Sequence, residues 1–458
     1  MSNENLLIYP TVGLFVYDLA QGIGQTEDKI DQNHQQFWQK IYGDKISAPQ
    51  LEQLKQAETE TADYIKLLGN EKIVPFESTL DGYCYPVKIG DTYAVLFDLS
   101  GKIEPDDKKF APEEIDRLGW QKEKIISRVN PPPTIGQSWL VWGQLTADDQ
   151  DALATAKNCY SKLNLFPNAK WETDFQTAGQ FLGADFYELW LPPGERGNIS
   201  ENYHVLICLF PYTNGSSIRD ISKTVGQLYM PHLMRLFAYR NKVIWAYTQS
   251  RQLKADLKDT SRTIQQIVSE LLEQVNFPKI DLKKLQYNLV NCLKILLIYA
   301  TCISELEEQE STISTNIKNY NKRLETISEK MGNEPNNFKF MANFSDFAKE
   351  KYLSQVKADN TSLSPGLRLL ENAIETIEGI IEIERAKSDR TLNVTIGTVG
   401  VGIGISGVAA SVYASQIKSA ASPANPMDVN AVFGLSICWG IVAGAIVFAL
   451  IKIGKNWR

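Results

Sequence analysis

Two uncharged runs decide the expected architecture: LNVTIGTVGVGIGISGVAASVY at 392–413 and VNAVFGLSICWGIVAGAIVFALI at 429–451. As helices, their 22 and 23 residues would each extend roughly 30 Å, enough to cross the hydrocarbon core of a bilayer. Pro423 and Pro426 prevent either helix from continuing through the connection. The sequence therefore predicts a C-terminal two-helix transmembrane hairpin, with an external turn at 418–428 and the second span and a basic tail at 429–458.

Charges beside the hairpin predict its orientation. Basic residues flank it on both outer sides, at Arg385, Lys387, Arg390, Lys452, Lys455 and Arg458. The turn carries Lys418, which Asp428 balances. Because cytosolic flanks are enriched in Lys and Arg, both termini are expected in the cytosol. We therefore expect a multi-pass protein of the cell membrane, with the lipid bilayer as a partner.

Small residues predict close helix packing. They recur at four-residue spacing, including Gly400, Gly402, Gly404, Ser406, Gly440 and Gly444. Such stripes let a second helix approach closely, so we expect self-association with the first span inside. The alternative is tight packing of one hairpin without a pore. Gly402–Gly407 also matches GxGxxG, but a second apolar run follows instead of a βαβ unit, so nucleotide binding is not expected.

A pore would need polar groups, and the first run supplies several. The pore-lining candidates are Asn393, Thr395, Thr398 and Ser406. They are the groups available to replace ion hydration, since neither run carries a charge. Glu384 and Asp389, just before the first run, are candidates for the pore mouth.

Helical patterns predict a long stalk before the membrane. Leu367, Leu370, Ile374, Ile377 and Ile381 alternate three and four apart, which is typical of a coiled-coil seam. Since no proline follows before the first run, 364–417 is expected to be one long helix continuing into the span. Residues 216–363 are expected to form antiparallel helices with loops at 332–337 and 359–365. The apolar stretch 289–303 is shorter than a span, which predicts a buried core helix.

The N-terminal half is expected to hold two cytosolic α+β units, at 1–130 and 136–215. Strands are predicted at 6–19, 83–89, 92–99, 139–145, 186–191 and 203–210, and helices at 27–41, 48–68 and 147–163. Gly90-Asp91 predicts a hairpin between two of these strands. The fold class is therefore an α+β N-terminal region, a helical stalk and a transmembrane hairpin.

Composition and motifs exclude several functions. A net charge of −7 and a pI near 5.3 give no indication of nucleic-acid binding. Six cysteines without a CxxC pair and three scattered histidines predict reduced thiols and no metal site. No catalytic motif occurs, so we expect neither an enzyme nor a cofactor. His204 and Cys208 are expected in the core of a strand.

One basic group on a predicted helix is a candidate anion site. It consists of His232, Arg235, Arg240 and Lys242. The alternative is an ordinary solvated helical face.

The arrangement resembles the architecture of CorA-type magnesium transporters over roughly Ser364–Arg458. The shared features are a cytosolic α/β domain, a long helix entering the first span, a short external turn and a basic tail. That family carries a Gly-Met-Asn motif after its first span, where this chain has Ala421-Ser-Pro-Ala-Asn-Pro-Met-Asp428. The resemblance implies a multimer that conducts ions, without specifying magnesium.

The expected function is thus a multimeric membrane protein whose cytosolic domain senses a signal and gates or perturbs the membrane. The alternative is a membrane-tethered interaction scaffold without conduction. Either function implies a cytosolic ligand or protein partner that the sequence does not identify.

Overall fold

The computed structural model describes residues 3–22, 24–43, 46–56, 62–69, 73–76, 80–102, 110–165, 167, 169–192, 203–212, 218–228, 232–275, 281–331 and 338–387. The chain divides into two compact units. The first comprises Met1–Leu272 and Val290–Ile374, and the second Glu273–Leu289 and Glu375–Arg458. The predicted hairpin, at 392–413 and 429–451, lies outside the described residues.

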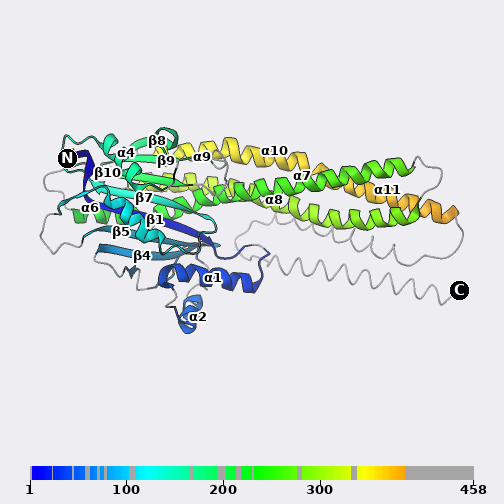
Figure 1. Ribbon diagram of the computed structural model, residues 1–458, viewed down its shortest axis with the longest axis horizontal. Coiled ribbons are helices and arrows are strands. Elements are labelled where there is room, and N and C mark those ends of the chain that lie inside the picture. The colour runs from blue at the N-terminus through cyan, green and yellow to red at the C-terminus, as the bar shows by residue number, and fades with distance from the viewer. Residues whose placement is uncertain are drawn as a thin grey trace. The chain divides into compact units, whose positions relative to one another are not determined.

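The first unit contains one sheet, shown in Figure 1. Its strands are β1 (Leu6–Leu19), β2 (Ile65–Lys66), β3 (Val74–Pro75), β4 (Leu80–Ile89), β5 (Thr92–Lys102), β6 (Pro112–Glu114), β7 (Gly136–Gln144), β8 (Phe175–Phe181), β9 (Ala184–Trp190) and β10 (His204–Phe210). The main order is β2-β4-β5-β1-β7-β10-β9-β8, while β3 pairs with β4 and β6 with β1. The pairs are antiparallel except β7–β10, which is parallel.

Strand β1 joins the two segments that were expected as separate units. It pairs with β5 on one side and with β7 on the other, so 1–130 and 136–215 share one sheet. Residues 7–18 of β1 are buried without interruption because helices cover both sheet faces. The hairpin predicted at Gly90-Asp91 joins β4 to β5, and Gly90 has the positive φ of 57° that its turn requires.

The helices are α1 (Glu27–Tyr42), α2 (Ala48–Gln56), α3 (Arg117–Ile126), α4 (Ala152–Leu163), α5 (Trp171–Asp174), α6 (Ile218–Leu228), α7 (Met234–Val275), α8 (Leu282–Met331), α9 (Ala342–Phe347), α10 (Ser354–Leu363) and α11 (Pro365–Lys387). Three short helical turns complete the described elements: η1 (Asn3–Asn5), η5 (Lys339–Met341) and η6 (Ala348–Leu353). The predicted helix 147–163 begins only at Ala152, because Asp151 caps it through the backbone N–H groups of Leu153 and Ala154. The predicted helix 48–68 is wrong at its end, since Ile65–Lys66 forms β2.

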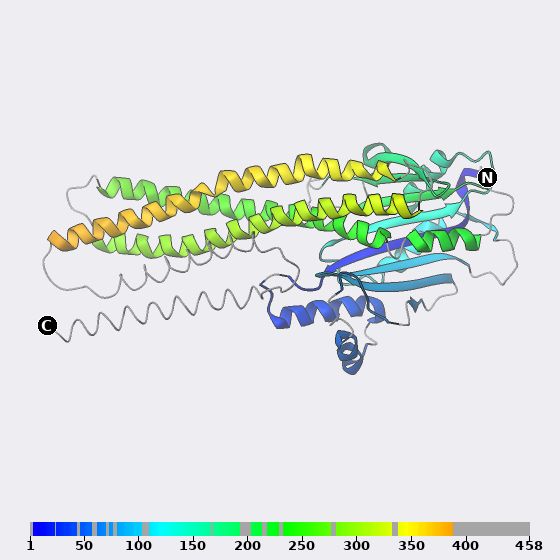
Figure 2. The same ribbon diagram turned by 180° about the vertical axis from the view of Figure 1, so that it is seen from behind.

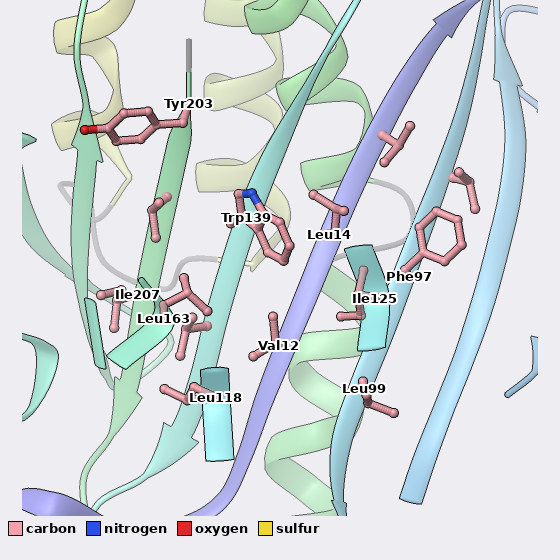
Figure 3. Packing of buried hydrophobic residues seen from close by; sticks show 14 of the residues in the cluster. Val12, Leu14, Phe97, Leu99, Leu118, Ile125, Trp139, Leu163, Tyr203 and Ile207 are labelled. Atoms are coloured by element: carbon pink, nitrogen blue, oxygen red, sulfur yellow. The ribbon is translucent and has the colours of Figure 1, made fainter. Parts of the chain in front are cut away.

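The first face of the sheet packs against α1, α3 and α4. Alternate residues of β1 and its neighbours supply the sheet side of this core, including Val12, Leu14, Phe97, Trp139 and Ile207. Leu118 and Ile125 of α3 and Leu163 of α4 cover them, as Figure 3 shows. The period of two along each strand places these side chains together.

The second face packs against the first turns of α7. The Tyr17 hydroxyl donates to the Met234 carbonyl oxygen at 2.9 Å, and the Asn241 side-chain amide donates to Ser138 Oγ at 2.9 Å. Phe15 meets Phe237 edge-to-face, with ring centroids 5.1 Å apart. Both faces of the sheet are therefore covered by helices (Figures 1 and 2).

The long helices of the first unit pack through apolar residues at helical spacing. Leu257 and Ile264 of α7 and Leu306, Ile313 and Ile327 of α8 are buried. The Asp359 carboxylate of α10 pairs with Arg251 and Lys254 of α7, at 2.5 and 2.6 Å. These contacts hold α10 beside α7.

The loop predicted at 359–365 is instead almost continuous helix. Leu363 ends α10, and Pro365 begins α11, since proline is tolerated in a first helical turn. The Leu367 N–H donates to the Ser364 carbonyl, which leaves the Leu363 carbonyl outside the helical ladder. The Tyr299 hydroxyl of α8 donates to that carbonyl at 2.8 Å. The Tyr299 hydroxyl thus supplies the hydrogen bond that the Leu363 carbonyl oxygen lacks where α10 meets α11.

The apolar stretch of α8 is more exposed than the sequence predicts. Val290, Leu297 and Ile298 are 51%, 57% and 58% exposed, whereas Leu289, Cys292, Tyr299 and Ile303 are buried, so the core helix predicted over 289–303 is buried on one side only. Among helices within the described ranges, one, over Leu282–Lys330, is long and apolar enough to cross a membrane, and 28% of its most apolar window is buried.

The described part of the second unit is short. Leu285 and Leu289 of α8 and Ile377 and Ile381 of α11 are buried there. The two α11 residues belong to the apolar seam predicted from the three- and four-residue spacing.

Candidate functional site

The membrane site candidates lie almost wholly outside the described residues. These are Asn393, Thr395, Thr398, Gly400, Gly402, Gly404, Ser406, Gly440, Gly444 and Asp389. Glu384 falls within the described backbone, near the end of α11. The predicted pore and packing stripe therefore stay predictions, and the described chemistry is that of the sheet and its helices.

Three charged or titratable side chains meet on the second face of the sheet. They are Glu188 of β9, His204 of β10 and Arg240 of α7, here called the buried charge cluster, and each is 0% exposed. The strand alternation explains their meeting: Leu189 and Val205 face the opposite core, so Glu188 and His204 face the helices. Arg240 enters from α7, whose first turns lie on this face.

Aromatic rings enclose the buried charge cluster. The Arg240 guanidinium lies 4.6 Å from the ring centre of Phe344 and 5.6 Å from that of Trp190. The His204 ring meets Phe237 edge-to-face at 4.8 Å. Arg240 therefore sits between β9 and α9, held by ring faces that attract a cation.

Hydrogen bonding within the buried charge cluster is incomplete. Glu188 Oε1 and His204 Nε2 lie 3.2 Å apart. Within the described part of the chain, neither Glu188 oxygen, neither His204 ring nitrogen and no Arg240 nitrogen has a partner of good hydrogen-bond geometry. Buried polar groups are normally satisfied, so this is an energetically expensive arrangement.

Burial and mutual charge set the protonation states. Burial raises the pKa of Glu188 to about 8, against the opposing effect of the Arg240 charge. Burial and Arg240 together hold the pKa of His204 well below 6.5, so the imidazole is neutral at pH 7. Glu188 consequently exchanges its proton near neutral pH, next to a permanently charged guanidinium.

The buried charge cluster has no exposed side-chain surface with which to meet a substrate. The cluster instead holds Arg240 of α7 against β9 and α9. A carboxyl that titrates beside Arg240 changes the strength of that attachment. Its chemistry is therefore suited to coupling the sheet to the helices rather than to catalysis.

The basic group predicted on one helix is divided by the structure. Arg240 is buried, and the Lys242 ammonium pairs with Asp91. His232 and Arg235 remain together at the start of α7, where the charge of Arg323 from α8 acts on both. The sequence could not supply Arg323, because it lies about 90 residues further along the chain.

A second buried carboxylate has a structural role. Asp174 accepts hydrogen bonds from the Tyr160 and Tyr203 hydroxyls, each at 2.5 Å, and from the backbone N–H of Lys170 at 3.0 Å. Burial opposes ionisation, but these donors lower the pKa of Asp174 overall. The carboxylate joins α4, the start of α5 and the residue before β10.

Metal and thiol chemistry find no support in the described ranges. No group of three or more His, Cys, Asp or Glu side chains there is placed to hold a metal ion. Cys84, Cys159 and Cys208 are free and buried, and burial raises their pKa. His204 and Cys208 lie in β10 as expected, and both are buried.

One signal for the buried charge cluster lies in the sequence itself. Glu188 is the single charge in the apolar strand segment FYELWL, which spans 186–191. A charge at an inward strand position requires a partner, and Arg240 on the predicted helix was available.

Comparisons with known proteins identify no relative: no protein-family model matches the chain, and no curated protein matches it.

Proposed function

We propose that this is a multimeric membrane protein whose cytosolic sheet region senses a signal and passes it through the long helices to gate or perturb the membrane. The single observation that carries the proposal is the seating of Arg240, on α7, inside the sheet's second face. A change in the sheet at β9 or β10 would move or recharge this helix, because the Arg240 guanidinium is fully buried and lies over the Trp190 ring of β9.

Further contacts give the signal a route beyond α7. Asp359 ties α10 to Arg251 and Lys254, and α11 begins directly after α10. Residues 388–391 then connect α11 to the first uncharged run. In the proposal, the runs 392–413 and 429–451 form the two spans, both termini are cytosolic, and the architecture follows the CorA-type pattern.

A membrane-tethered scaffold is the second candidate, and one observation favours it. Val290, Leu297 and Ile298 leave an apolar strip of α8 exposed. Exposed apolar strips of this kind commonly contact a partner or a membrane. A scaffold would use this strip and the tether without conducting.

The deciding experiment measures ion flux from liposomes that contain the purified full chain. A Gly-Pro pair inserted after Ile383 should interrupt α11, because proline breaks the helical ladder. Flux that depends on the uninterrupted helix supports the gating function.

A matched control separates helix breakage from mere lengthening. Four alanines inserted at the same place keep the helix and rotate its continuation by only about 40°. This variant should retain flux that the Gly-Pro variant loses. Absence of flux from the parent chain under all ionic conditions, with liposome association retained, would contradict gating and support the scaffold.

A further inference from the structure

Basic side chains gather where α7 begins and α8 approaches its end. They are His232 just before α7, Arg235 in its first turn, and Arg323 and Lys330 in the last turns of α8, here called the basic cluster. Figures 1 and 2 both place this end of the two helices against the sheet. All four residues belong to the first unit.

Aromatic hydroxyls border the basic cluster on the sheet side. The Arg235 guanidinium lies 4.2 Å from the ring centre of Tyr64, and the Tyr64 hydroxyl lies 3.1 Å from that of Tyr85 in β4. Arg235 and Arg323 both act electrostatically on Tyr64. The Arg235 guanidinium and the Tyr64 hydroxyl therefore lie together, within the electrostatic reach of Arg323, and this location offers both charge and hydrogen-bond donors.

The mutual repulsion within the basic cluster is substantial. His232 is 8% exposed, and burial with the charges of Arg323, Lys330 and Arg235 lowers its pKa to about 4. Burial, and after it the charge of Arg323, lower the pKa of Arg235. The Asp63 carboxylate raises that pKa. Gathering like charges in a partly desolvated place destabilises the folded chain unless an anion compensates them.

Unsatisfied donors point to what is missing. Within the described residues, the buried Nδ1 of His232 and the buried Nε of Arg323 have no hydrogen-bond partner. His232 is more than nine-tenths buried, so water does not compensate it well. A ligand with several anionic oxygens would receive a hydrogen bond from Arg323 Nε, and from His232 Nδ1 in the tautomer or charge state that carries a proton there.

Helix capping explains only part of the basic cluster. Lys330 lies in the last turn of α8, where a cation complements the negative end of the helix dipole. Arg323 lies about two turns earlier, beyond the reach of that effect. Arg235 lies in the first turn of α7, at the positive end of the helix, where cations are unfavourable and anions are favoured.

We propose that the basic cluster binds a phosphate-bearing small ligand, with Arg235 and Arg323 holding the phosphate oxygens and Tyr64 flanking the bound group. Guanidinium groups suit this role because their donor pairs match phosphate oxygens. Bound phosphate would also bring α7, α8 and the segment before β2 together. The site would be the place where the sheet region receives its signal, and in that respect alone it rests on the proposed function.

The test measures binding of inorganic pyrophosphate to the full chain in mild detergent, by calorimetry at fixed salt. Arg235→Gln and Arg323→Gln should each weaken binding roughly tenfold or more, since each removes charge-assisted hydrogen bonds. Lys330→Gln changes an exposed side chain, so folding is spared, and binding should weaken by a few-fold. Arg262→Gln is the matched control, because Arg262 is exposed on α7 and pairs with Asp259.

A second arm identifies the source of the phosphate. Detergent micelles with and without phosphatidic acid replace pyrophosphate, and the same variants are compared. Pyrophosphate binding that the variants lose supports a soluble ligand, whereas binding only to phosphatidate micelles, lost in the same variants, supports a lipid headgroup.

Two results would overturn the phosphate site. One is no binding of either probe, and the other is equal weakening by Arg262→Gln and Arg323→Gln. Because neither arm measures flux, the site and the gating function can fail separately.

Discussion

Replacing Arg240 by methionine tests the buried charge cluster most directly. Methionine keeps much of the arginine volume between Phe344 and Trp190 but removes the charge facing Glu188. Above pH 8, where Glu188 is ionised, Arg240→Met leaves a buried carboxylate without its cation. Breaking a buried pair on one side costs about 3–5 kcal/mol, and we expect the lower end because Glu188 can take up a proton instead.

The same substitution should cost less in acid. Below about pH 6, Glu188 is neutral with or without Arg240, because burial has raised its pKa to about 8. What remains is the loss of guanidinium contact with two rings, about 1 kcal/mol. The destabilisation by Arg240→Met should therefore grow as the pH rises through 8.

The parent chain should show the matching pH dependence. Glu188 has a folded-state pKa above its unfolded value, so its protonation stabilises the fold fully below about pH 4.5 and the contribution is lost as the pH rises through about 8. Glu188→Gln should remove this dependence, because the amide does not titrate.

A double substitution, compared with the two single ones, measures the coupling between Arg240 and Glu188. Arg240→Met with Glu188→Leu replaces the pair by apolar groups, which is often neutral in measured cases, so we expect stability within about 1 kcal/mol of the parent. Urea unfolding of the full chain in mild detergent, followed by tryptophan fluorescence, measures the parent, Arg240→Met, Glu188→Leu and the double variant at pH 6 and pH 9. Equal stability of Arg240→Met and the parent at pH 9, or additive effects in the double variant, would refute the reasoning.

Three further predictions concern other parts of the chain. Asp174→Asn should destabilise the first unit by about 1.5–3 kcal/mol in a urea titration, because the amide cannot accept all the hydrogen bonds that the carboxylate receives; unchanged stability would remove its structural role. Gly402→Leu should shift the detergent-solubilised protein to a smaller mass, at about 1–2 kcal/mol per lost helix contact, and an unchanged oligomer would assign assembly to other segments. A cysteine at Ser419 should react with a membrane-impermeant reagent from outside and one at Asn456 should not, and the reverse pattern would contradict the proposed topology.

Local sequence patterns predicted much of the secondary structure because their causes are local. The strand at Leu6–Leu19 is confirmed to the residue, and the Gly90 turn follows from the conformational freedom of glycine. The buried faces of α7 and α8 follow from helical spacing. The wrong helix prediction at Ile65–Lys66 also has a local cause, since a two-residue strand is too short to leave a periodic signal.

Pairings between distant segments could not be predicted in the same way. The register of β1 with β7 depends on residues more than 100 positions apart, and it merged two expected units into one sheet. The basic cluster joins residues about 90 positions apart, so half of it was visible on α7 and Arg323 was not. The apolar stretch of α8 was misjudged because length and composition do not say which side another element covers.

The place of β10 inside the sheet has a consequence for biosynthesis. This strand lies between β7 and β9, so the sheet cannot close before Phe210 has left the ribosome. Roughly 180 residues separate Phe210 from the first uncharged run, which at 5–20 residues per second means a delay of roughly 10–35 s. The sheet therefore has time to fold before the first proposed span emerges. A sheet that folds before the first proposed span emerges would stay on the ribosome's side of the bilayer, which is the side that the proposed topology assigns to it.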